Sequence, residues 1–388
     1  MKLGIDASNL RAGGGVTHLV ELLRAADPVA YGFANIVIWG GKETLQCLED
    51  RPWLEKCYQP CLDLGLPYRV FWQRFRLSTL AFQSGCDLLF VPGGAYVGDF
   101  RPIVAMCRNM IPFVWLEIRR YGLSLMTLKW ILLRWSHSRS YRNADGLIFL
   151  TSYARETVLA QIKSVAGKTI TIPHGINSRF SLLPRLQRPI EAFSVSRPFQ
   201  ILYVSSVDWY KHQWHVADAV AQLRKEGFPL SLDLIGPAYA PALVRLTATL
   251  GRVDPGAAFI KYHGPIPHAE LHARFALADM CIFASSCENM PNILLESMAS
   301  GLPIACSKHG PMPELLGDAG IYFDPEKPKD ISAAIRQLIL SKDLRERQSK
   351  LSFKLVEKYS WQRTAGETFR FLSDMVRSSE TSRVVRLP

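Results

Sequence analysis

The sequence predicts an α/β protein made of two domains, in which parallel sheets are covered by helices on both sides. Its 388 residues are enough for two domains with sizeable cores, and 48% of them are hydrophobic. Short apolar runs typical of buried strands alternate with helical patterns along the chain. This alternation is typical of parallel sheets, because each pair of neighbouring parallel strands needs a crossover connection.

The first half of the chain contains six strand candidates. A glycine-rich turn over residues 9–16 follows the first candidate and leads into a predicted helix over residues 17–26. Ligands of parallel sheets bind beyond the carboxyl ends of the strands, so the turns after the strands are the candidate binding loops. The six candidates are residues 2–6, 35–39, 87–91, 103–107, 146–150 and 169–172.

In the second half, the most informative pattern is a buried strand followed by a loop and a helix. Residues 278–284 form an apolar run, Pro291 and Asn292 suit the entrance of a helix, and Gly301 suits its end. Free amide groups at such a helix start, together with the positive end of the helix dipole, favour a diphosphate.

Two carboxylates eight residues apart flank this helix entrance. Glu288 precedes the helix and Glu296 lies inside it, so the two acids can address different parts of one ligand. A carboxylate accepts hydrogen bonds from two hydroxyl groups at once, which suits ribose or a hexose. The alternative is that both acids are solvated surface residues, as most acids are. The surrounding strand and helix pattern favours the ligand site.

These residues, with several other motifs of the second half, resemble the signature of retaining glycosyltransferases of the "group 1" family. Lys211 follows the strand pattern 201–205 in the way that this family's phosphate-binding lysine does. The resemblance is strong over residues 199–370 and weaker before them. It implies two facing Rossmann-like domains, the GT-B architecture. Further motifs in family order are residues 232–237, 263–267, 310–315 and 318–325.

The resemblance implies a role for each motif residue. Glu288 is expected to position the sugar, Lys211 to neutralise the leaving diphosphate and Glu296 to hold the nucleotide ribose. It also implies a UDP-, GDP- or ADP-sugar donor, retention of anomeric configuration, no metal and no cofactor. The remaining residues expected at the nucleotide-sugar site are Ser206, Gly236, Ile266, Asn289, Met290, Pro291 and Asn292.

Two positions depart from the family pattern. Ser206 stands where arginine is frequent, which leaves Lys211 as the main cation for the diphosphate; taken alone, such a lysine is more often solvated. Asn109 stands near a place where many relatives have a histidine that contacts the sugar. An amide replaces its hydrogen bonds but does not titrate near neutral pH. The alternative is that Asn109 caps a turn.

The first domain is expected to contribute a donor and acceptor cleft. Gly13, Gly14 and Gly15 follow the first strand, where missing side chains allow backbone to approach a phosphate or sugar, although a plain tight turn also explains them. His174 lies in a segment that resembles the family's link between domains, and it is either a ligand contact or a structural turn histidine.

The expected domain boundaries follow from these patterns. The first domain covers residues 1–180, and a linker interrupted by Pro184, Pro189 and Pro198 covers 181–198. The second domain covers 199–355. Residues 356–388 contain a closing helix near 361–375 that, by resemblance, crosses back onto the first domain.

Positive charge is concentrated in the first half. Residues 1–190 carry 23 Lys and Arg against 13 Asp and Glu, or +10 of the total +12. Residues 119–142 are apolar and basic without an acid, so they predict a peripheral contact with an anionic membrane. The alternative is a core helix whose arginines face solvent. Trp115, Trp130 and Trp135 suit either interpretation.

Other classes of protein are disfavoured. The first residues form a strand pattern rather than a signal peptide, so we expect a cytoplasmic protein, with membrane association at the cytoplasmic face. No uncharged apolar run is long enough to span a bilayer. The chain has no aromatic-basic pattern typical of RNA binding, so no nucleic-acid partner is expected.

The sequence therefore predicts a glycosyltransferase that moves a hexose-type sugar from a nucleoside-diphosphate sugar to a glycan acceptor. The basic first domain favours an acceptor that is lipid-linked or part of a cell-envelope glycan, such as lipopolysaccharide or another polysaccharide. The alternative is a nucleotide-sugar epimerase or a phosphorylase that shares the two-domain architecture.

Overall fold

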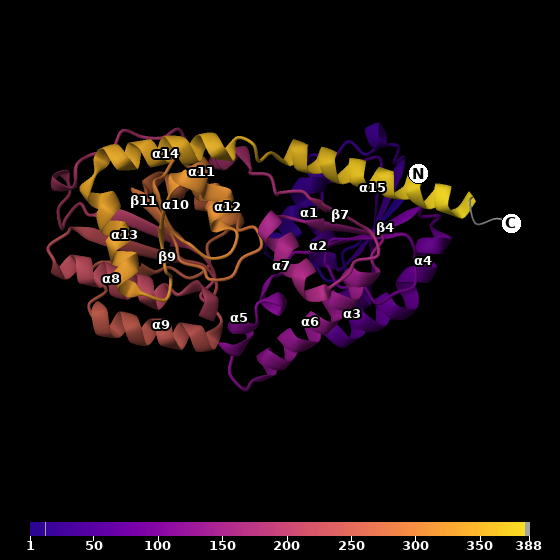
Figure 1. Cartoon of the computed structure of the whole chain (residues 1–388), viewed down its shortest axis with the longest axis horizontal. Helices are drawn as coiled ribbons and strands as arrows, with labels where there is room; N and C mark the ends of the chain where they lie inside the picture. The colour runs from indigo at the N-terminus through magenta and orange to yellow at the C-terminus, as the bar shows by residue number, and fades with distance from the viewer. Residues whose placement is uncertain (12, 385–388) are drawn as a thin grey trace. The chain divides into compact units, whose positions relative to one another are not determined.

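The computed structural model describes residues 1–11 and 13–384, and it divides into two compact units (Figure 1). Of the described residues, the first unit contains 1–11, 13–118, 123–175 and 359–384, and the second contains 119–122 and 176–358. Each unit has its own parallel sheet. The predicted α/β class with two Rossmann-like domains is confirmed.

The first unit is built on a seven-stranded sheet with the strand order β3-β2-β1-β4-β5-β6-β7, in which every pairing is parallel. Four of its strands, β1, β4, β5 and β6, are almost wholly buried, as their apolar runs predict. The edge strand β3 is only half-buried and contains charged residues, so it was not predicted. The strands are β1 Lys2–Asp6, β2 Asn35–Gly40, β3 Leu54–Tyr58, β4 Leu88–Val91, β5 Ile103–Met106, β6 Gly146–Phe149 and β7 Lys168–Thr171.

Helices of the first unit include α1, which begins at Gly14 rather than at residue 17, because the glycine turn itself starts the helix. Helices α3 and α4 are joined without a break by the π-helical residues Gln73–Leu77. The helices are α1 Gly14–Arg24, α2 Lys42–Gln46, α3 Leu66–Trp72, α4 Ser78–Gln83, α5 Trp115–Arg119, α6 Leu125–Asn143, α7 Ser152–Ile162 and α15 Trp361–Val384.

The closing helix α15 packs within the first unit although it ends the chain. Phe369 on α15 contacts the rings of Tyr31 and Phe33, with centroids 6.4 and 6.1 Å apart. Where the chain leaves β7, a side chain at Gly175 would meet the backbone nitrogen of Trp361 at 2.2 Å, so only glycine fits there. The predicted return of the C-terminal helix to the first domain is confirmed.

The second unit is built on a six-stranded parallel sheet with the order β10-β9-β8-β11-β12-β13. Its strands are β8 Phe199–Val204, β9 Leu230–Ile235, β10 Ile260–Tyr262, β11 Met280–Phe283, β12 Ile304–Ser307 and β13 Gly320–Phe323. Its helices are α8 Gln213–Lys225, α9 Ala240–Val253, α10 Leu271–Leu277, α11 Asn292–Ala299, α12 Met312–Leu316, α13 Pro328–Leu340 and α14 Lys342–Val356.

Strand order explains where a ligand can bind in the second unit. The chain builds outward from β8 in one direction through β9 and β10, and then returns to pair β11 with the other side of β8. The loops that follow β8 and β11 therefore start side by side at the carboxyl edge of the sheet, and the chain then continues from them in opposite directions along the sheet. Such a switch point is where open parallel sheets bind their ligands.

The division between the units differs from the predicted boundaries. The chain passes from the first unit to the second between Gly175 and Ile176, and it returns at Tyr359. Residues 181–198, expected as a linker, belong to the second unit. Their prolines interrupt regular structure, but the segment still packs, since Phe193 is buried against the ring of Phe199 at 5.1 Å.

Candidate functional site

The candidate site lies at the carboxyl edge of the second sheet, where two loops are tied together. One loop follows β8 and ends in a short 3₁₀ turn at Trp209–Lys211, and the other follows β11 and leads into α11. The backbone N–H of Ser286 donates to the carbonyl of Tyr210 at 2.8 Å. This bond brings Lys211 of the first loop next to Glu288 of the second.

Lys211 and Glu288 form an ion pair between the Lys211 Nζ and the Glu288 Oε1 atoms. Both side chains are largely buried, at 9% and 14% exposure. The position of Lys211 is fixed further by the hydroxyl of Tyr203, which donates to the Lys211 carbonyl at 2.7 Å. The sequence analysis predicted both residues at the site, and it did not predict that they pair with each other.

Helix α11 begins at Asn292 with Pro291 at its cap position, as predicted. Asn289, Met290 and Pro291 form the buried end of the loop that enters the helix, and Asn292 is half-buried. The helix ends near the expected Gly301, whose φ of 60° lies in the left-handed region. The loop from Glu288 thus leads into α11, and the first backbone amides of the helix follow Glu288 closely in the chain.

Glu296 lies inside α11 and is almost fully buried, with 4% of its side chain exposed. Its Oε1 atom lies 2.8 Å from Nε2 of His268. The other ring nitrogen, Nδ1 of His268, lies 3.2 Å from the Arg179 guanidinium, which donates to it, while Nε2–H donates to the carboxylate. Within the described part of the chain, the second oxygen of Glu296 is buried without a hydrogen-bond partner.

His268 was not predicted as a site residue, because its contact with Glu296 is not visible in the sequence. It follows β10 by six residues, and its partner Glu296 lies 28 residues further along the chain. The pattern 263–267, which directly precedes it, was the available signal.

Three further predicted residues follow neighbouring strands at the same edge of the sheet. Gly236 follows β9 with a φ of 147°, and a side chain there would lie 2.1 Å from the Ser205 carbonyl oxygen. Ser206 follows β8, and its carbonyl accepts from the Gln213 amide at 2.8 Å. Ile266 is half-buried after β10. Glycine at position 236 is thus required by the close approach of two loops.

The predicted residues of the first unit lie at the carboxyl edge of its own sheet. Gly13 caps α1 with a φ of 69°, and both Gly13 and Gly14 are exposed. The Arg108 guanidinium donates to the Gly14 carbonyl at 2.7 Å. The Asn109 side chain accepts from the backbone N–H of Ile111 at 3.0 Å, so it caps the turn that follows β5. This contact is the turn-capping alternative considered for Asn109.

His174 is buried rather than open to solvent. Its Nδ1 atom lies 2.7 Å from Nδ1 of His18 on α1, and both rings pack against Trp361. Burial lowers the pKa of both histidines well below the usual value, and the nearby Arg108 charge lowers each further. Both rings are therefore neutral near pH 7. The structure gives His174 the packing role that was the alternative to ligand contact.

Neither a metal cluster nor a membrane-spanning helix occurs in the part of the chain that the structure describes. Across residues 1–11 and 13–384, no group of three or more His, Cys, Asp or Glu side chains is arranged to hold a metal ion. Over the same residues, no helix has the length and apolar character needed to cross a bilayer.

The fold and the site define a class of protein. Residues 198–341 match the family model described as "Glycosyl transferases group 1", a stretch that includes Lys211, Glu288 and Glu296. The predicted resemblance to group 1 glycosyltransferases is confirmed over this stretch, which lies in the second unit. The architecture is GT-B.

Individual relatives agree with this class. The chain is 24% identical over 238 residues to O-antigen chain mannosyltransferase B of Escherichia coli, covering 59% of this chain and 60% of that protein. It is 25% identical over 249 residues to a GDP-mannose-dependent phosphatidylinositol dimannoside mannosyltransferase of Mycobacterium tuberculosis, covering 63% and 61%. The chain thus aligns with about three fifths of the length of these curated relatives.

Solved structures share the fold over nearly the whole chain. Sucrose-phosphate synthase of Thermosynechococcus elongatus superposes with a TM-score of 0.76 at 17% identity, covering 97% of this chain and 100% of that one. HepE of Anabaena in complex with UDP-glucose gives a TM-score of 0.69 at 16% identity, covering 96% and 100%.

Proposed function

We propose that this protein transfers a hexose from a nucleoside-diphosphate sugar to a glycan acceptor, with retention of anomeric configuration and without a metal ion. The observation that carries the proposal is the buried Lys211–Glu288 pair at the amino end of α11, on the carboxyl edge of the second sheet. Relatives named as mannosyltransferases and a structural neighbour bound to UDP-glucose support a nucleotide-sugar donor.

The leaving diphosphate would lie at the start of α11. Glycosyl transfer develops negative charge on the leaving oxygen, which preorganised donors stabilise without further rearrangement. The backbone amides that open α11 and the Lys211 ammonium supply such donors, and both lie in a largely buried setting where charge interactions are strong. The Lys211 ammonium would then form an ion pair with the diphosphate and weaken its ion pair with Glu288.

Glu288 would bind hydroxyl groups of the transferred sugar. When the diphosphate pairs with the Lys211 ammonium, the Glu288 carboxylate loses part of its ion pair. It then accepts hydrogen bonds from sugar hydroxyls beside the reacting carbon. The negative charge of Glu288 also stabilises the positive charge that develops on the sugar ring in the transition state. One residue thus positions the sugar and stabilises its reacting state.

Glu296 would hold the nucleotide ribose through its unpaired oxygen. A buried carboxylate oxygen without a partner is costly, and a ribose hydroxyl would supply the missing donor. His268 fixes the other oxygen, so the carboxylate is already oriented before the nucleotide arrives. Ser206, Gly236 and Ile266 complete the surroundings expected for the nucleotide.

The acceptor we propose is a lipid-linked or cell-envelope glycan. The names of the two mannosyltransferase relatives refer to O-antigen chains and to phosphatidylinositol dimannoside, both of which fit this class. In the first unit, Gly13, Gly14 and Gly15 lie at the start of α1, after β1, and are candidates for acceptor contact. We place the reaction on the cytoplasmic side, where nucleotide sugars are made.

The test is release of nucleoside diphosphate from UDP-, GDP- and ADP-hexoses, with and without a lipid-glycan extract as acceptor. The expected result is acceptor-dependent release from one donor, with the product keeping the donor's anomeric configuration by NMR. Interconversion of the sugar without an acceptor would instead identify an epimerase, and phosphate-dependent cleavage of a glycan would identify a phosphorylase. Either result would overturn the proposal.

A further inference from the structure

Helix α6 of the first unit exposes large apolar side chains to solvent. A surface helix normally buries its apolar stripe and exposes its polar face. The buried positions of α6 are Trp130, His137, Ser138, Ser140 and Tyr141. The outward stripe is apolar and is formed, at intervals of three and four residues, by Leu125, Leu128, Leu132 and Trp135, each more than half exposed.

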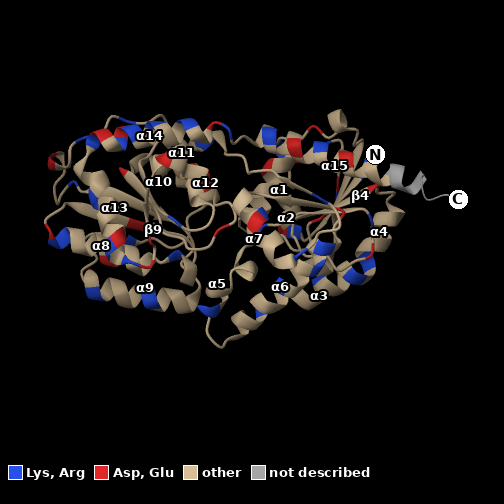
Figure 2. Ribbon diagram, viewed as in Figure 1, with Lys and Arg blue, Asp and Glu red and all other residues tan. Residues whose placement is uncertain are grey.

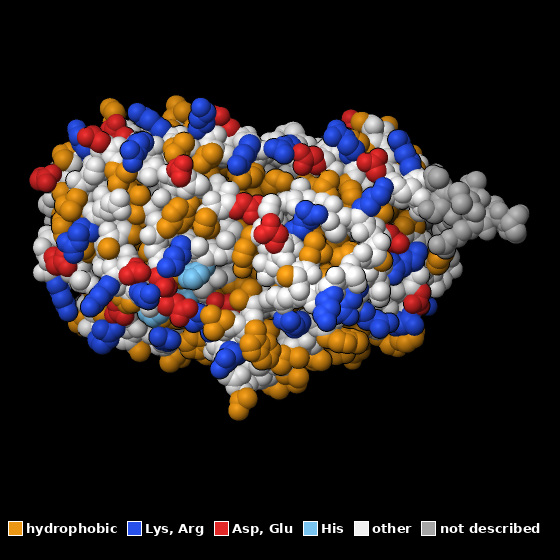
Figure 3. Space-filling model, viewed as in Figure 1, with side chains coloured by type: hydrophobic (Ala, Val, Ile, Leu, Met, Phe, Trp, Pro, Cys, Tyr) orange, Lys and Arg blue, Asp and Glu red, His pale blue; other side chains and the backbone are white. Residues whose placement is uncertain are grey.

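A second stripe of the same kind lies on the continuous helix formed by α3, the π-helical residues and α4. Its members are again spaced by about one or two helical turns and are more than half exposed. They are Tyr68, Phe71, Phe75 and Phe82. Figure 3 shows hydrophobic side chains gathered over α6 and the neighbouring α3. Large exposed apolar side chains that gather on one face of a protein often mark an interaction or membrane site.

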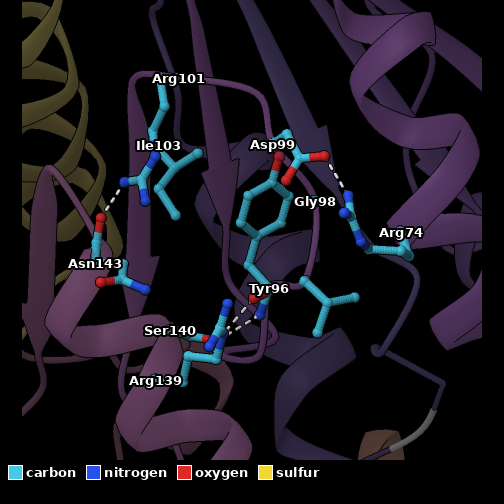
Figure 4. A pocket seen from close by; sticks show the side chains of 10 residues that line it. Arg74, Tyr96, Gly98, Asp99, Arg101, Ile103, Arg139, Ser140 and Asn143 are labelled. Atoms are coloured by element: carbon cyan, nitrogen blue, oxygen red, sulfur yellow. Dashed lines mark hydrogen bonds and ion pairs between the residues drawn. The ribbon is translucent and has the colours of Figure 1, made fainter.

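A cavity lined by three arginines lies beside the two stripes. Arg74, which follows Phe71 by three residues, and Arg139, which follows Trp135 by one helical turn, line the same cavity of about 250 Å³ together with Arg101 (Figure 4). Arg74 is paired with Asp99, and Arg101 with Asp145. Arg139 makes no ion pair with any described residue, so its charge is available to an anion.

Acidic residues are absent from both helical segments. Residues 64–86 and 123–144 contain no Asp or Glu, whereas they carry seven Lys and Arg: Arg69, Arg74, Arg76, Lys129, Arg134, Arg139 and Arg142. The blue and red residues of Figure 2 show the same imbalance along α3 and α6. Exposed apolar stripes bordered by arginine and lysine match the interface of an anionic bilayer, with aromatic rings among the headgroups and cations near the phosphates.

We infer that the outward stripes of α3–α4 and α6 form a docking face for an anionic phospholipid bilayer, with Arg139 binding a headgroup phosphate. A second copy of this chain is a poorer occupant, because it would bring two uniformly basic faces together. This docking face includes α3–α4 in addition to the predicted segment 119–142, and it excludes two parts of that segment.

The two excluded parts are residues 119–122, at the start of the segment, and Trp130. Residues 119–122 belong to the second unit, where Arg120 pairs with Glu326 and the Tyr121 hydroxyl donates to Asp208 at 2.9 Å. Trp130 is 9% exposed and packs in the core, so it is not an interfacial anchor. Trp135 is exposed and remains one.

The test is flotation of the full-length protein with vesicles of phosphatidylglycerol and phosphatidylethanolamine, compared with vesicles of phosphatidylcholine alone. The wild type should bind the anionic vesicles at least about tenfold more tightly. The variants Phe71→Ser/Phe75→Ser and Leu128→Ser/Leu132→Ser should each lose about tenfold or more in vesicle affinity. Lys129→Gln/Arg139→Gln should lose about tenfold for anionic vesicles only.

The matched control is Val29→Ser/Leu340→Ser, which removes two similarly exposed apolar side chains outside the docking face and should float like the wild type. Thermal melts and nucleotide-sugar binding should be unchanged in every variant, which separates this inference from the proposed function. Wild type that does not float, or apolar variants that float like wild type, would overturn it. So would light scattering that shows a dimer dissociated by the apolar substitutions while flotation is unchanged.

Discussion

At the scale of single residues, the pairing of Lys211 with Glu288 implies competition between the acid and the donor diphosphate for one ammonium group. We predict that Glu288→Gln lowers kcat by at least about a hundredfold, because the sugar loses its charged partner. The affinity for the free nucleoside diphosphate should not fall, since Lys211 is then unpaired. Steady-state rates and calorimetric titration measure the two quantities.

The control for this prediction is Glu357→Gln, which changes an exposed acid of the same unit and should alter neither quantity. A Glu288→Gln protein that keeps its turnover would contradict the role assigned to the acid. Loss of diphosphate affinity in that variant would contradict the competition.

Glu296 gives a second prediction, which concerns the nucleotide rather than the sugar. In Glu296→Gln, the amide oxygen can still accept from His268, but an NH₂ group replaces the unpaired acceptor oxygen. Donor affinity should fall about tenfold or more, in line with the loss of a hydrogen bond to a charged group. A nucleotide that lacks both ribose hydroxyls should bind the two proteins equally. A preference of that analogue for the wild type would refute the ribose contact.

Buried histidines make the stability of the fold depend on pH. Burial lowers the pKa of His137 to about 4, from an ordinary 6.5. Between these values the unfolded chain binds a proton that the folded chain does not, so the unfolding free energy falls as pH drops from 6.5 to 4. The slope is up to about 1.4 kcal/mol per pH unit for each such histidine. The buried pair of His18 and His174 acts in the same direction.

Urea unfolding at pH 7 and pH 5 measures this loss. The variant His137→Asn should lose less stability between the two pH values than the wild type, because one titrating group has been removed. Equal losses in both proteins would mean that His137 is not responsible.

Sequence reasoning named the candidate residues that belong to a contiguous motif and missed those defined by packing. Glu288, Asn292 and Glu296 follow a buried strand at helix-entrance spacing, and the structure brings them together at one edge of the sheet. His268 could not be found in this way, because its contact with Glu296 exists only after β10 and α11 have packed. The burial of His174 likewise depends on His18, which lies 156 residues away.

At the scale of elements, Gly236 shows how the end of one strand controls the loop of another. We predict that Gly236→Ala destabilises the second unit by about 2–4 kcal/mol, since its side chain would collide with the Ser205 carbonyl. Gly251 is the matched control: it lies in the exposed part of α9 with no atom near a new side chain. Gly251→Ala should stabilise by about 0.5–1 kcal/mol. Equal effects in thermal unfolding would contradict the account of Gly236.

The strands were predictable where they are buried on both faces, because such strands read as continuous apolar runs. Strand β3 lies at the sheet edge and alternates exposed and half-buried residues, so its pattern resembled a loop. For α6 the sequence left two alternatives open, a helix that faces a membrane and a core helix. Periodicity shows that a helix has an apolar side, but not whether that side meets the core or the surroundings.

At the scale of the whole molecule, the two sheets and the returning C-terminal helix were predictable, whereas the division between the units was not. Packing inside each unit defines this division: Gly175 against Trp361 in the first unit, and Phe193 against Phe199 in the second. A proline-rich segment without regular structure resembles a linker in the sequence. Only its tertiary contacts show that residues 181–198 are part of the second unit.

The central claim is that a nucleotide sugar binds at the amino end of α11, between Glu288 and Glu296. The most direct test is a crystal structure of the protein with its nucleotide-sugar donor. We expect the diphosphate within hydrogen-bond distance of Lys211 and of the backbone amides that open α11, with the ribose on Glu296 and the hexose on Glu288. A donor bound elsewhere, with Lys211 and Glu288 still paired and both acids free of ligand, would contradict the claim.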